Sequence, residues 1–377
     1  MSDANQSKTP CQNRPVMAGD ESGLVALRRQ IDAVDEELLK LLNHRAKLSL
    51  EVGKLKAGTG GPVFRPQREH EIVNALAGKN PGPLPNVHLH AIWREIFASS
   101  RSLQQPLRVA YLGPEGTHSH FAAVGFLGQL MEYRPCANFR EIFASVQDGR
   151  CALGVVPLEN SLHGSVVQNF DLFTEFDVHI QAEFVNRIQH CLLSSAPSVE
   201  TIKTIYSHPQ ALAQCQNWLR RHAPHAVLVS VESTAAAARR CLQEPHTAAI
   251  GHHSLSSLLS LPVLAASLED EADNQTRFVV IAPQPAENPE ADRTSVLFTL
   301  PDRPGALARV LDLFARSGIN LRKLESRPLR AEPWKYAFFA DLECSLCKPD
   351  YAPIMRELWD VCASIRLLGC YTALGFR

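Results

Sequence analysis

Asn274-Gln275-Thr276-Arg277-Phe278 leads directly into an apolar run, Phe278-Val279-Val280-Ile281-Ala282. The apolar run is typical of a buried strand. The residues before it supply two amides, a hydroxyl and a guanidinium, and strand ends are where α/β folds present polar groups to a ligand. Taken alone, the stretch is more simply explained as a polar turn. The rest of the chain decides between these two interpretations.

Four more polar clusters lie at predicted strand-to-helix turns. They are Gly113-Pro114-Glu115-Gly116-Thr117-His118-Ser119, Pro157-Leu158-Glu159-Asn160-Ser161, Ser207-His208-Pro209-Gln210 and Ser233-Thr234. Each one alone is more simply capping and turn chemistry. Strands are predicted at 107–112, 151–156, 178–182, 204–206, 227–231, 248–250 and 278–282, with helices at 139–147, 210–221 and 234–242. This alternation predicts a doubly wound α/β region with two lobes around a cleft.

The preceding segment has a helical pattern instead. Apolar residues recur at helical spacing from Leu24 to Leu42, and mostly acidic residues fill the opposite face. The pattern predicts a helix of about 30 residues, near 45 Å long, followed by helices at 67–76 and 87–104. Because a helix this long cannot bury its apolar face within so small a segment, we expect an intertwined dimer.

A polar linker at 283–292 leads to a smaller C-terminal unit. Strands are predicted at 295–300, 319–326, 336–343 and 365–371, and helices at 304–317 and 351–362. The first helix begins with a proline and closes at a glycine. This βαββαβ order predicts a ferredoxin-like α+β unit. We therefore expect a multi-domain chain with domains at 20–105, 107–282 and 294–377.

Composition restricts the partners and the compartment. The 377 residues carry 38 basic and 39 acidic side chains, a formal net charge of -1, which argues against nucleic acid and anionic membranes as partners. No run is long enough to span a membrane, and residues 1–20 lack the apolar core of a secretory signal. Ten scattered cysteines suit a reducing cytoplasm. Cys344-Ser345-Leu346-Cys347 lacks a second pair at zinc-binding spacing, so no metal is expected.

Two cations of the long helix are placed to act together. Lys56 follows Arg45 by about three turns, within about 20° of the same face and about 16 Å along the axis. The pair could hold one small dianion, although solvated surface charge explains most helix cations. Arg28 lies about 25 Å beyond Arg45. In an antiparallel dimer it could serve the partner's site.

Leu27-Arg28, Asn43-His44-Arg45, Val52-Gly53-Lys54-Leu55-Lys56, Arg68-Glu69 and 100–104 resemble the helical chorismate mutase family. The resemblance covers roughly residues 20–105. It implies the Claisen rearrangement of chorismate to prephenate, with no cofactor or covalent intermediate. Catalysis would rest on holding the reactive conformer and on stabilising charge at the ether oxygen.

The resemblance also implies site residues. The catalytic ones are Arg28, Arg45, Lys56, Glu69 and Gln104, and the substrate-binding ones include Arg65, Arg68 and Ser100. The first two arginines would take the carboxylates, one from each chain of the dimer. Lys56 and Gln104 would flank the ether oxygen, and Glu69 would accept from the substrate hydroxyl. Arg65 stands where some members have an acidic residue. Because an amide donates without titrating, Gln104 predicts mutase activity that is nearly flat from about pH 6 to 8.

The five polar clusters together resemble the prephenate dehydratase family over about residues 107–282. This implies a two-lobed, periplasmic-binding-protein-like fold and the conversion of prephenate to phenylpyruvate. Aromatisation drives the reaction, so the protein need only help the hydroxyl leave and hold the carboxylate in a poorly solvating pocket. Thr276 would hydrogen bond to the departing oxygen. The implied substrate-binding residues are Thr117, Ser119, Glu159, Asn160, Ser161, Ser207, Gln210, Arg277 and Phe278.

Two further residues bear on the interpretation of this site. Arg277 is as well suited to an ion pair between lobes as to a substrate carboxylate. His163 stands where similar proteins are expected to have an acidic residue.

Two stretches of the C-terminal unit resemble the phenylalanine-binding form of the ACT module. They are Asp302-Arg303-Pro304-Gly305-Ala306-Leu307 and Glu325-Ser326-Arg327-Pro328. The resemblance implies that L-phenylalanine binds between paired modules, at Gly305, Ala306, Leu307, Glu325, Ser326, Arg327 and Pro328, and favours a less active state. Gly305 could let backbone amides approach an amino-acid carboxylate at the helix start.

The three resemblances together imply a bifunctional enzyme of phenylalanine biosynthesis, acting on chorismate and prephenate and inhibited by phenylalanine. One alternative is that only one of the two activities is retained. Another is a two-lobed amino-acid sensor that binds without turnover.

Overall fold

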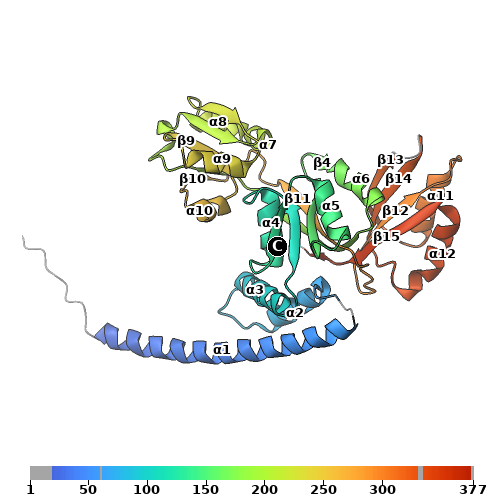
Figure 1. Ribbon diagram of the computed structural model, residues 1–377, viewed down its shortest axis with the longest axis horizontal. Coiled ribbons are helices and arrows are strands. Elements are labelled where there is room, and N and C mark those ends of the chain that lie inside the picture. The colour runs from blue at the N-terminus through green and yellow to red at the C-terminus, as the bar shows by residue number, and fades with distance from the viewer. Residues whose placement is uncertain (1–18, 60–61, 330–333, 375–377) are drawn as a thin grey trace, which may run out of the picture.

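The computed structural model describes residues 19–59, 62–329 and 334–374. Most of the stretch on which the expected absence of a secretory signal rests lies outside these residues. A helical region, a two-lobed region and a C-terminal domain follow one another along the chain (Figure 1). Within the described residues, no helix is both long and apolar enough to cross a bilayer.

The helical region consists of three helices. They are α1 (Gly19–Thr59), α2 (Pro66–Lys79) and α3 (Asn86–Gln104). α1 has 41 residues, more than the pattern predicts, and is about 60 Å long. Its C-terminal half packs on α3, while its N-terminal half extends past α2 and α3 (Figure 1). There the apolar side chains stay exposed, for example Leu27 at 57% and Ile31 at 59%.

Lobe 1 of the two-lobed region is a mixed sheet with the strand order β16-β5-β11-β3-β1-β2, and β4 pairs with β3. Its strands are β1 (Arg108–Leu112), β2 (Glu132–Cys136), β3 (Leu153–Asn160), β4 (Gly164–Ser165), β5 (His179–Arg187), β11 (Gln275–Ala282) and β16 (Ala373–Leu374). Its helices are α4 (His118–Leu127), α5 (Phe139–Gln147) and α6 (Val167–Glu175).

Lobe 2 has its own five-stranded sheet, in the order β10-β6-β9-β7-β8. The strands are β6 (Cys191–Leu193), β7 (Thr204–Ser207), β8 (Val227–Ser230), β9 (Thr247–Gly251) and β10 (Val263–Ala266). The helices are η1 (Val199–Thr201), α7 (Pro209–Gln214), α8 (Gln216–His222), α9 (Thr234–Cys241) and α10 (Ser254–Leu259). The chain enters lobe 2 after β5 and returns through β11. The helix expected at 210–221 is interrupted at Cys215, where the backbone leaves the helical conformation.

The structure corrects the expected position of the opening stretch. Strand β11 begins at Gln275, so Thr276 lies inside a strand rather than in a turn before it. The reason is that β3 and β5 both extend far enough to pair with it: Thr276 faces Asn160 on β3 and Asn186 on β5. Thr276 therefore sits on an internal strand of the sheet, where its backbone is held from both sides.

The C-terminal domain has the βαββαβ order that the sequence predicts. Its elements are β12 (Arg293–Thr299), α11 (Ala306–Arg316), β13 (Leu321–Pro328), β14 (Tyr336–Leu342), η2 (Pro349–Tyr351), α12 (Ala352–Val361) and β15 (Ser364–Tyr371). The antiparallel sheet has the order β13-β14-β12-β15, so the ferredoxin-like prediction is confirmed. β16 then leaves this domain and pairs with β5 of lobe 1. Phe339 of β14 packs on Phe170 of α6, with ring centroids 4.7 Å apart, so the core of lobe 1 continues into the C-terminal domain.

Candidate functional site

A cavity of about 390 Å³ lies between the two lobes. Six residues singled out in the sequence line it: Thr117, Ser119, Asn160, Gln210, Thr276 and Phe278. Further lining residues include His118, His190, His208, Gln214, Glu232, Ser233 and Thr234. Since β3, β11 and α4 belong to lobe 1 and α7 and α9 to lobe 2, a ligand here would contact both lobes.

Asn160 fixes the hydroxyl of Thr276. The Asn160 amide oxygen accepts the backbone N–H groups of Leu162 (3.1 Å) and His163 (3.0 Å). The amide nitrogen therefore faces the other way, 3.0 Å from Thr276 Oγ1 and 2.8 Å from Asn274 Oδ1. Because Thr276 Oγ1 accepts from Asn160, its own proton remains available for a ligand.

Polar side chains line part of the cavity, but no lysine or arginine is among its described lining residues. Instead, the first turns of α4 and α9 line it from opposite lobes. Thr117 caps α4 by accepting from the His120 N–H, and Ser233 caps α9 by accepting from the Ala236 N–H. The remaining N–H groups of these turns and the positive ends of the helix dipoles favour an anion. The site can thus hold a carboxylate without a full opposing charge.

His118 is a cavity residue that the sequence did not single out. Both of its ring nitrogens are buried, and no described residue hydrogen bonds to either of them. Burial, reinforced by neighbouring His190 and His252, holds the pKa of His118 well below its ordinary value. A neutral imidazole therefore faces the cavity. In the sequence, the only indication that His118 belongs to this site is its position between the predicted binding residues Thr117 and Ser119.

Four of the predicted binding residues are directed elsewhere. Ser161 bridges the backbone of Asp273 and Gln275, and the Ser207 hydroxyl donates to the Ile250 carbonyl inside the lobe 2 sheet. Glu159 and Arg277 point toward the C-terminal domain. Side chains alternate between the two faces along a strand. Glu159 is next to Asn160 and Arg277 is next to Thr276, so both face the other side of the sheet.

The helical region assembles a second polar cluster. Arg45 of α1 donates to the Ser100 hydroxyl of α3, and its guanidinium lies 5.5 Å from the Phe97 ring centroid. Glu69 of α2 is near enough for Arg45 and Lys56 to lower its pKa, although burial raises that pKa more strongly. Burial and then Arg65 lower the pKa of Lys56. Three separate helices thus bring these groups to one place.

Gln104 is positioned by close packing against α1. A side chain at Gly53 would come within 3.1 Å of Gln104 Cγ, so glycine allows the two helices to approach. Lys56 and Gln104 line one cavity of about 600 Å³ together with residues of lobe 1. No described residue hydrogen bonds to the buried Gln104 Oε1.

Of the other predicted cations of this region, Arg28 and Arg68 lie apart from the cluster, whereas Arg65 is near enough to lower the pKa of Lys56. Arg28 is exposed on the N-terminal half of α1. Arg68 pairs with Glu71 at 3.5 Å. Arg65 and Arg68 both line a different cavity, next to the linker.

Comparisons with known proteins match this architecture. Residues 27–105 match the family model for chorismate mutase type II, 109–286 that for prephenate dehydratase and 294–346 that for the ACT domain. The bifunctional chorismate mutase/prephenate dehydratase of Aquifex aeolicus is 40% identical over 352 residues, which cover 92% of this chain and 97% of that protein. This chain belongs to that family.

Two solved structures share the dehydratase and ACT architecture. The prephenate dehydratase of Arthrobacter aurescens, solved in complex with L-Phe, is 32% identical with a TM-score of 0.64, covering 71% of this chain and 90% of its own. The quorum-quenching acylase GqqA is 28% identical with a TM-score of 0.65, covering 71% of this chain and 98% of its own.

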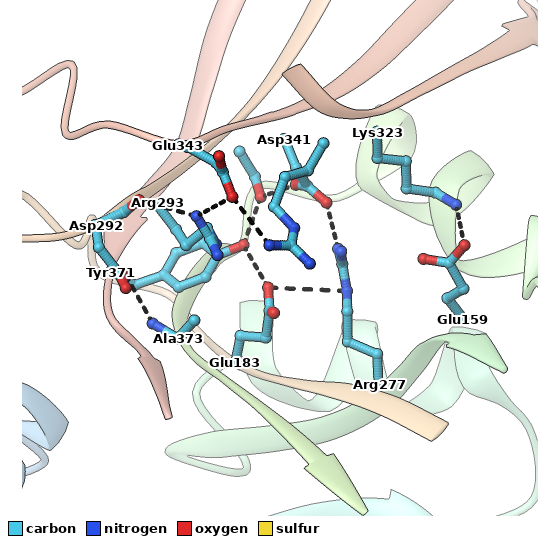
Figure 2. Close-up of polar contacts among 12 residues, drawn as sticks. Glu159, Glu183, Arg277, Asp292, Arg293, Lys323, Asp341, Glu343, Tyr371 and Ala373 are labelled. Carbon is cyan, nitrogen blue, oxygen red and sulfur yellow. Dashed lines mark hydrogen bonds and ion pairs between the residues drawn. The ribbon is translucent and has the colours of Figure 1, made fainter. Parts of the chain in front are cut away.

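Charged residues join the ACT domain to dehydratase lobe 1. Figure 2 shows Arg277 between Glu183 of β5 and Asp341 of β14, with a separation of 3.8 Å to Glu183. Asp341 is 1% exposed. Although burial alone would lower the pKa of Arg277, the two carboxylates raise it. Arg277 therefore forms an ion pair between lobe 1 and the ACT domain, rather than the ion pair between the two lobes that the sequence suggested, and it does not line the cavity.

The predicted regulatory residues fall into two groups. Gly305 begins α11 with φ of 81°, a left-handed conformation that favours glycine, and Ala306 and Leu307 pack into the ACT core. On β13, Glu325 accepts from the Ser165 hydroxyl at 2.8 Å, and Arg327 contacts both oxygens of Asp171. Ser326 and Pro328 alternate with them and are exposed.

Lys323 reinforces the junction from the same face of β13, 2.9 Å from Glu159 (Figure 2). Two of the four residues of the expected phenylalanine motif on β13, Glu325 and Arg327, are thus in contact with the dehydratase domain. Asp341, a single carboxylate within an apolar strand, was the signal in the sequence that could have revealed this junction.

Proposed function

We propose that this chain converts chorismate to prephenate in its helical region and prephenate to phenylpyruvate in the interlobe cavity. The observation that carries the second activity is the Thr276 hydroxyl, which Asn160 holds at the wall of that cavity with its proton free. Family membership supports both activities. The pathway served is phenylalanine biosynthesis, and phenylalanine acts as its inhibitor.

In the mutase step, positioning would do most of the work. Arg45, fixed by Ser100, would hold a substrate carboxylate. Lys56 and Gln104, which line one cavity, would donate to the ether oxygen as charge develops there. Glu69 would accept from the substrate hydroxyl. No proton needs to be transferred, because the rearrangement only redistributes bonds within the substrate.

In the dehydratase step, the bond from the ring to its carboxylate breaks and its electron pair enters the ring. The ring C–O bond then breaks, and the oxygen leaves with its electron pair as hydroxide, which takes up a proton to become water. Thr276 would hydrogen bond to this oxygen as it departs. Because the cavity offers helix N-termini rather than cations to the carboxylates, charge that disperses into CO2 and the ring loses little stabilisation.

The mutase site requires a second copy of the chain. Arg28 lies on the half of α1 whose apolar residues are exposed, far from Arg45. In a homodimer with antiparallel α1 helices, this face would be covered and Arg28 of the partner subunit would complete the site. The domain limits proposed are 20–105, 107–282 and 294–377, and the nine free cysteines among the described residues suit the cytoplasm.

Phenylalanine would bind at the start of α11, where Gly305 exposes backbone amides, and along β13. Because Glu325 and Arg327 of β13 already contact lobe 1, ligand contacts there would change the ACT–dehydratase junction directly. The complex of the Arthrobacter aurescens dehydratase with L-Phe supports this ligand.

One experiment separates the proposal from its alternatives. Pure protein is incubated with chorismate, and phenylpyruvate is followed by its absorbance, with prephenate supplied in a parallel sample. We expect phenylpyruvate from both substrates and less of it when phenylalanine is added. Phenylpyruvate formed from prephenate but not from chorismate would show that the mutase activity is lost. Ligand binding without phenylpyruvate formation from either substrate would indicate a sensor.

A further inference from the structure

Arg101 is a buried arginine at the junction between the mutase and dehydratase regions. It lies on α3 directly after Ser100 and is 3% exposed. One guanidinium nitrogen donates to Glu69 and another to the backbone carbonyl of Leu127. The guanidinium also lies 5.6 Å from the ring centroid of Phe64, which belongs to the apolar core of lobe 1.

The contact with Glu69 affects a mutase residue directly. The Glu69 side chain is only 24% exposed, and burial is the largest influence on its pKa, which it raises. Arg101 is the first of the groups that oppose this rise, ahead of Arg45 and Lys56. A carboxylate can accept several hydrogen bonds, so Glu69 can hold Arg101 with one oxygen and a substrate hydroxyl with its remaining capacity.

The contact with Leu127 reaches the dehydratase region. Leu127 ends α4, whose 10 residues span about 15 Å. The first turn of this helix, at His118 and Ser119, lines the dehydratase cavity. A cation at the C-terminal end of a helix is stabilised by the helix dipole. One helix therefore has the dehydratase cavity at its start and, at its end, the carbonyl that accepts from Arg101.

We infer that Arg101 is a positioning residue of the mutase reaction, which acts through Glu69 and is itself held in place by the Leu127 carbonyl of the dehydratase domain and by Phe64, whose ring packs into lobe 1. This inference rests on the proposed mutase function. It assigns the dehydratase domain a structural part in the mutase site. Arg101 orients the Glu69 carboxylate and favours its ionised form.

Arg94 provides a matched control on the same helix. It donates to the carbonyl of Gly125 at 3.0 Å, so it also joins α3 to the end of α4. Its side-chain partner is Glu95, at 3.1 Å, rather than Glu69. Replacing Arg94 removes a contact between the two domains without removing a partner of Glu69.

The test compares Arg101→Met, Arg101→Lys and Arg94→Met in the full-length protein. Mutase kcat/KM is measured from about pH 6 to about pH 8, and dehydratase activity is measured with added prephenate. Without Arg101 the pKa of Glu69 rises further. As pH falls, the Glu69 carboxylate therefore becomes protonated at a higher pH than in the wild type. We expect Arg101→Met to lower mutase kcat/KM about tenfold more at the acidic end than at the alkaline end. Arg101→Lys should retain the wild-type profile, and dehydratase activity should persist in both.

Arg94→Met is expected to leave the mutase pH profile unchanged. Equal losses of both activities in Arg101→Met and Arg94→Met would show that Arg101 only supports the interface, and would overturn the inference. An unchanged mutase profile in folded Arg101→Met would do the same. If Arg101→Met does not fold, Arg101→Gln takes its place and is combined with Glu69→Gln: the effect of the Arg101 replacement on mutase kcat/KM should vanish in that background. A persisting effect would contradict a role through Glu69.

Absence of mutase activity in the wild type would instead refute the proposed function.

Discussion

Asn160 and Thr276 face each other on the paired strands β3 and β11, and the Asn160 amide nitrogen lies 3.0 Å from Thr276 Oγ1. The same asparagine accepts two backbone N–H groups of its own loop. Its orientation is thus set by the backbone, and it in turn sets that of the threonine hydroxyl. This arrangement costs little when a ligand arrives, because both side chains are already in place.

Thr276→Ala should remove phenylpyruvate formation, because no other group is held in the same position to hydrogen bond to the leaving oxygen. We expect dehydratase kcat to fall at least about a hundredfold, the scale seen when a single transition-state donor is removed. Chorismate consumption should continue. Thr276→Ser keeps the hydroxyl and should retain most activity, and loss of both activities in Thr276→Ala would indicate misfolding instead.

Asn160→Asp tests the direction of the hydrogen bond. A carboxylate cannot donate to Thr276 Oγ1, so it would accept the threonine proton that the wild type keeps for the substrate. Dehydratase kcat should therefore fall by about the same factor as in Thr276→Ala, and the double variant should be no worse than either single one. Additive losses would mean that the two residues act separately.

Arg277→Met should destabilise the ACT–dehydratase junction. It would leave Glu183 and the buried Asp341 without their shared cation, which typically costs about 3–5 kcal/mol. We expect the melting temperature to drop by about 10 °C. Adding Asp341→Leu should restore part of this loss by removing a carboxylate left uncompensated. If Arg277 instead bound substrate, KM for prephenate would rise with no change in melting temperature.

Strands β2, β6 and β10 and helices α4, α6 and α10 were not predicted, but most other strands and helices followed from sequence periodicity, because each has a face that must be buried. The position of Thr276 inside a strand did not follow from the sequence. Strand β11 begins three residues before its apolar run, and this extension depends on how far β3 and β5 run. The sequence placed Asn160 and Thr276 in one site because both belong to recognised clusters. It could not separate Asn160 from neighbouring Glu159, as only the pleat of β3 decides which of them faces the cavity.

Residues at domain junctions were the hardest to foresee. Arg101 looks like any helical cation in the sequence, and its partners Glu69 and Leu127 come from two different regions. The same holds for Lys323 and Glu159, whose contact requires the ACT domain to be docked on lobe 1. A lone carboxylate in an apolar strand, such as Asp341, can indicate that a junction exists, but local patterns do not show which residues of another domain it meets.

Gly305→Asp should abolish inhibition by phenylalanine while leaving both catalytic activities. The backbone at Gly305 has φ of 81°, so any larger residue is strained there, and an aspartate would also repel the ligand carboxylate. The measurement is dehydratase activity against phenylalanine concentration. Ser326 is an exposed residue of β13, and Ser326→Ala serves as a second probe of the same site. Unchanged inhibition in both variants would exclude this location.

Gln104→Glu should make the mutase reaction dependent on acid. The wild-type amide donates to the ether oxygen at any pH, whereas a glutamate donates only when protonated. Because the side-chain oxygen of Gln104 is buried, the pKa of a glutamate there would be raised, and its protonated form would be lost as pH increases. The variant should thus be active mainly at acidic pH, while the wild type stays nearly flat from about pH 6 to 8. A variant with the flat profile of its parent would show that this position does not touch the ether oxygen.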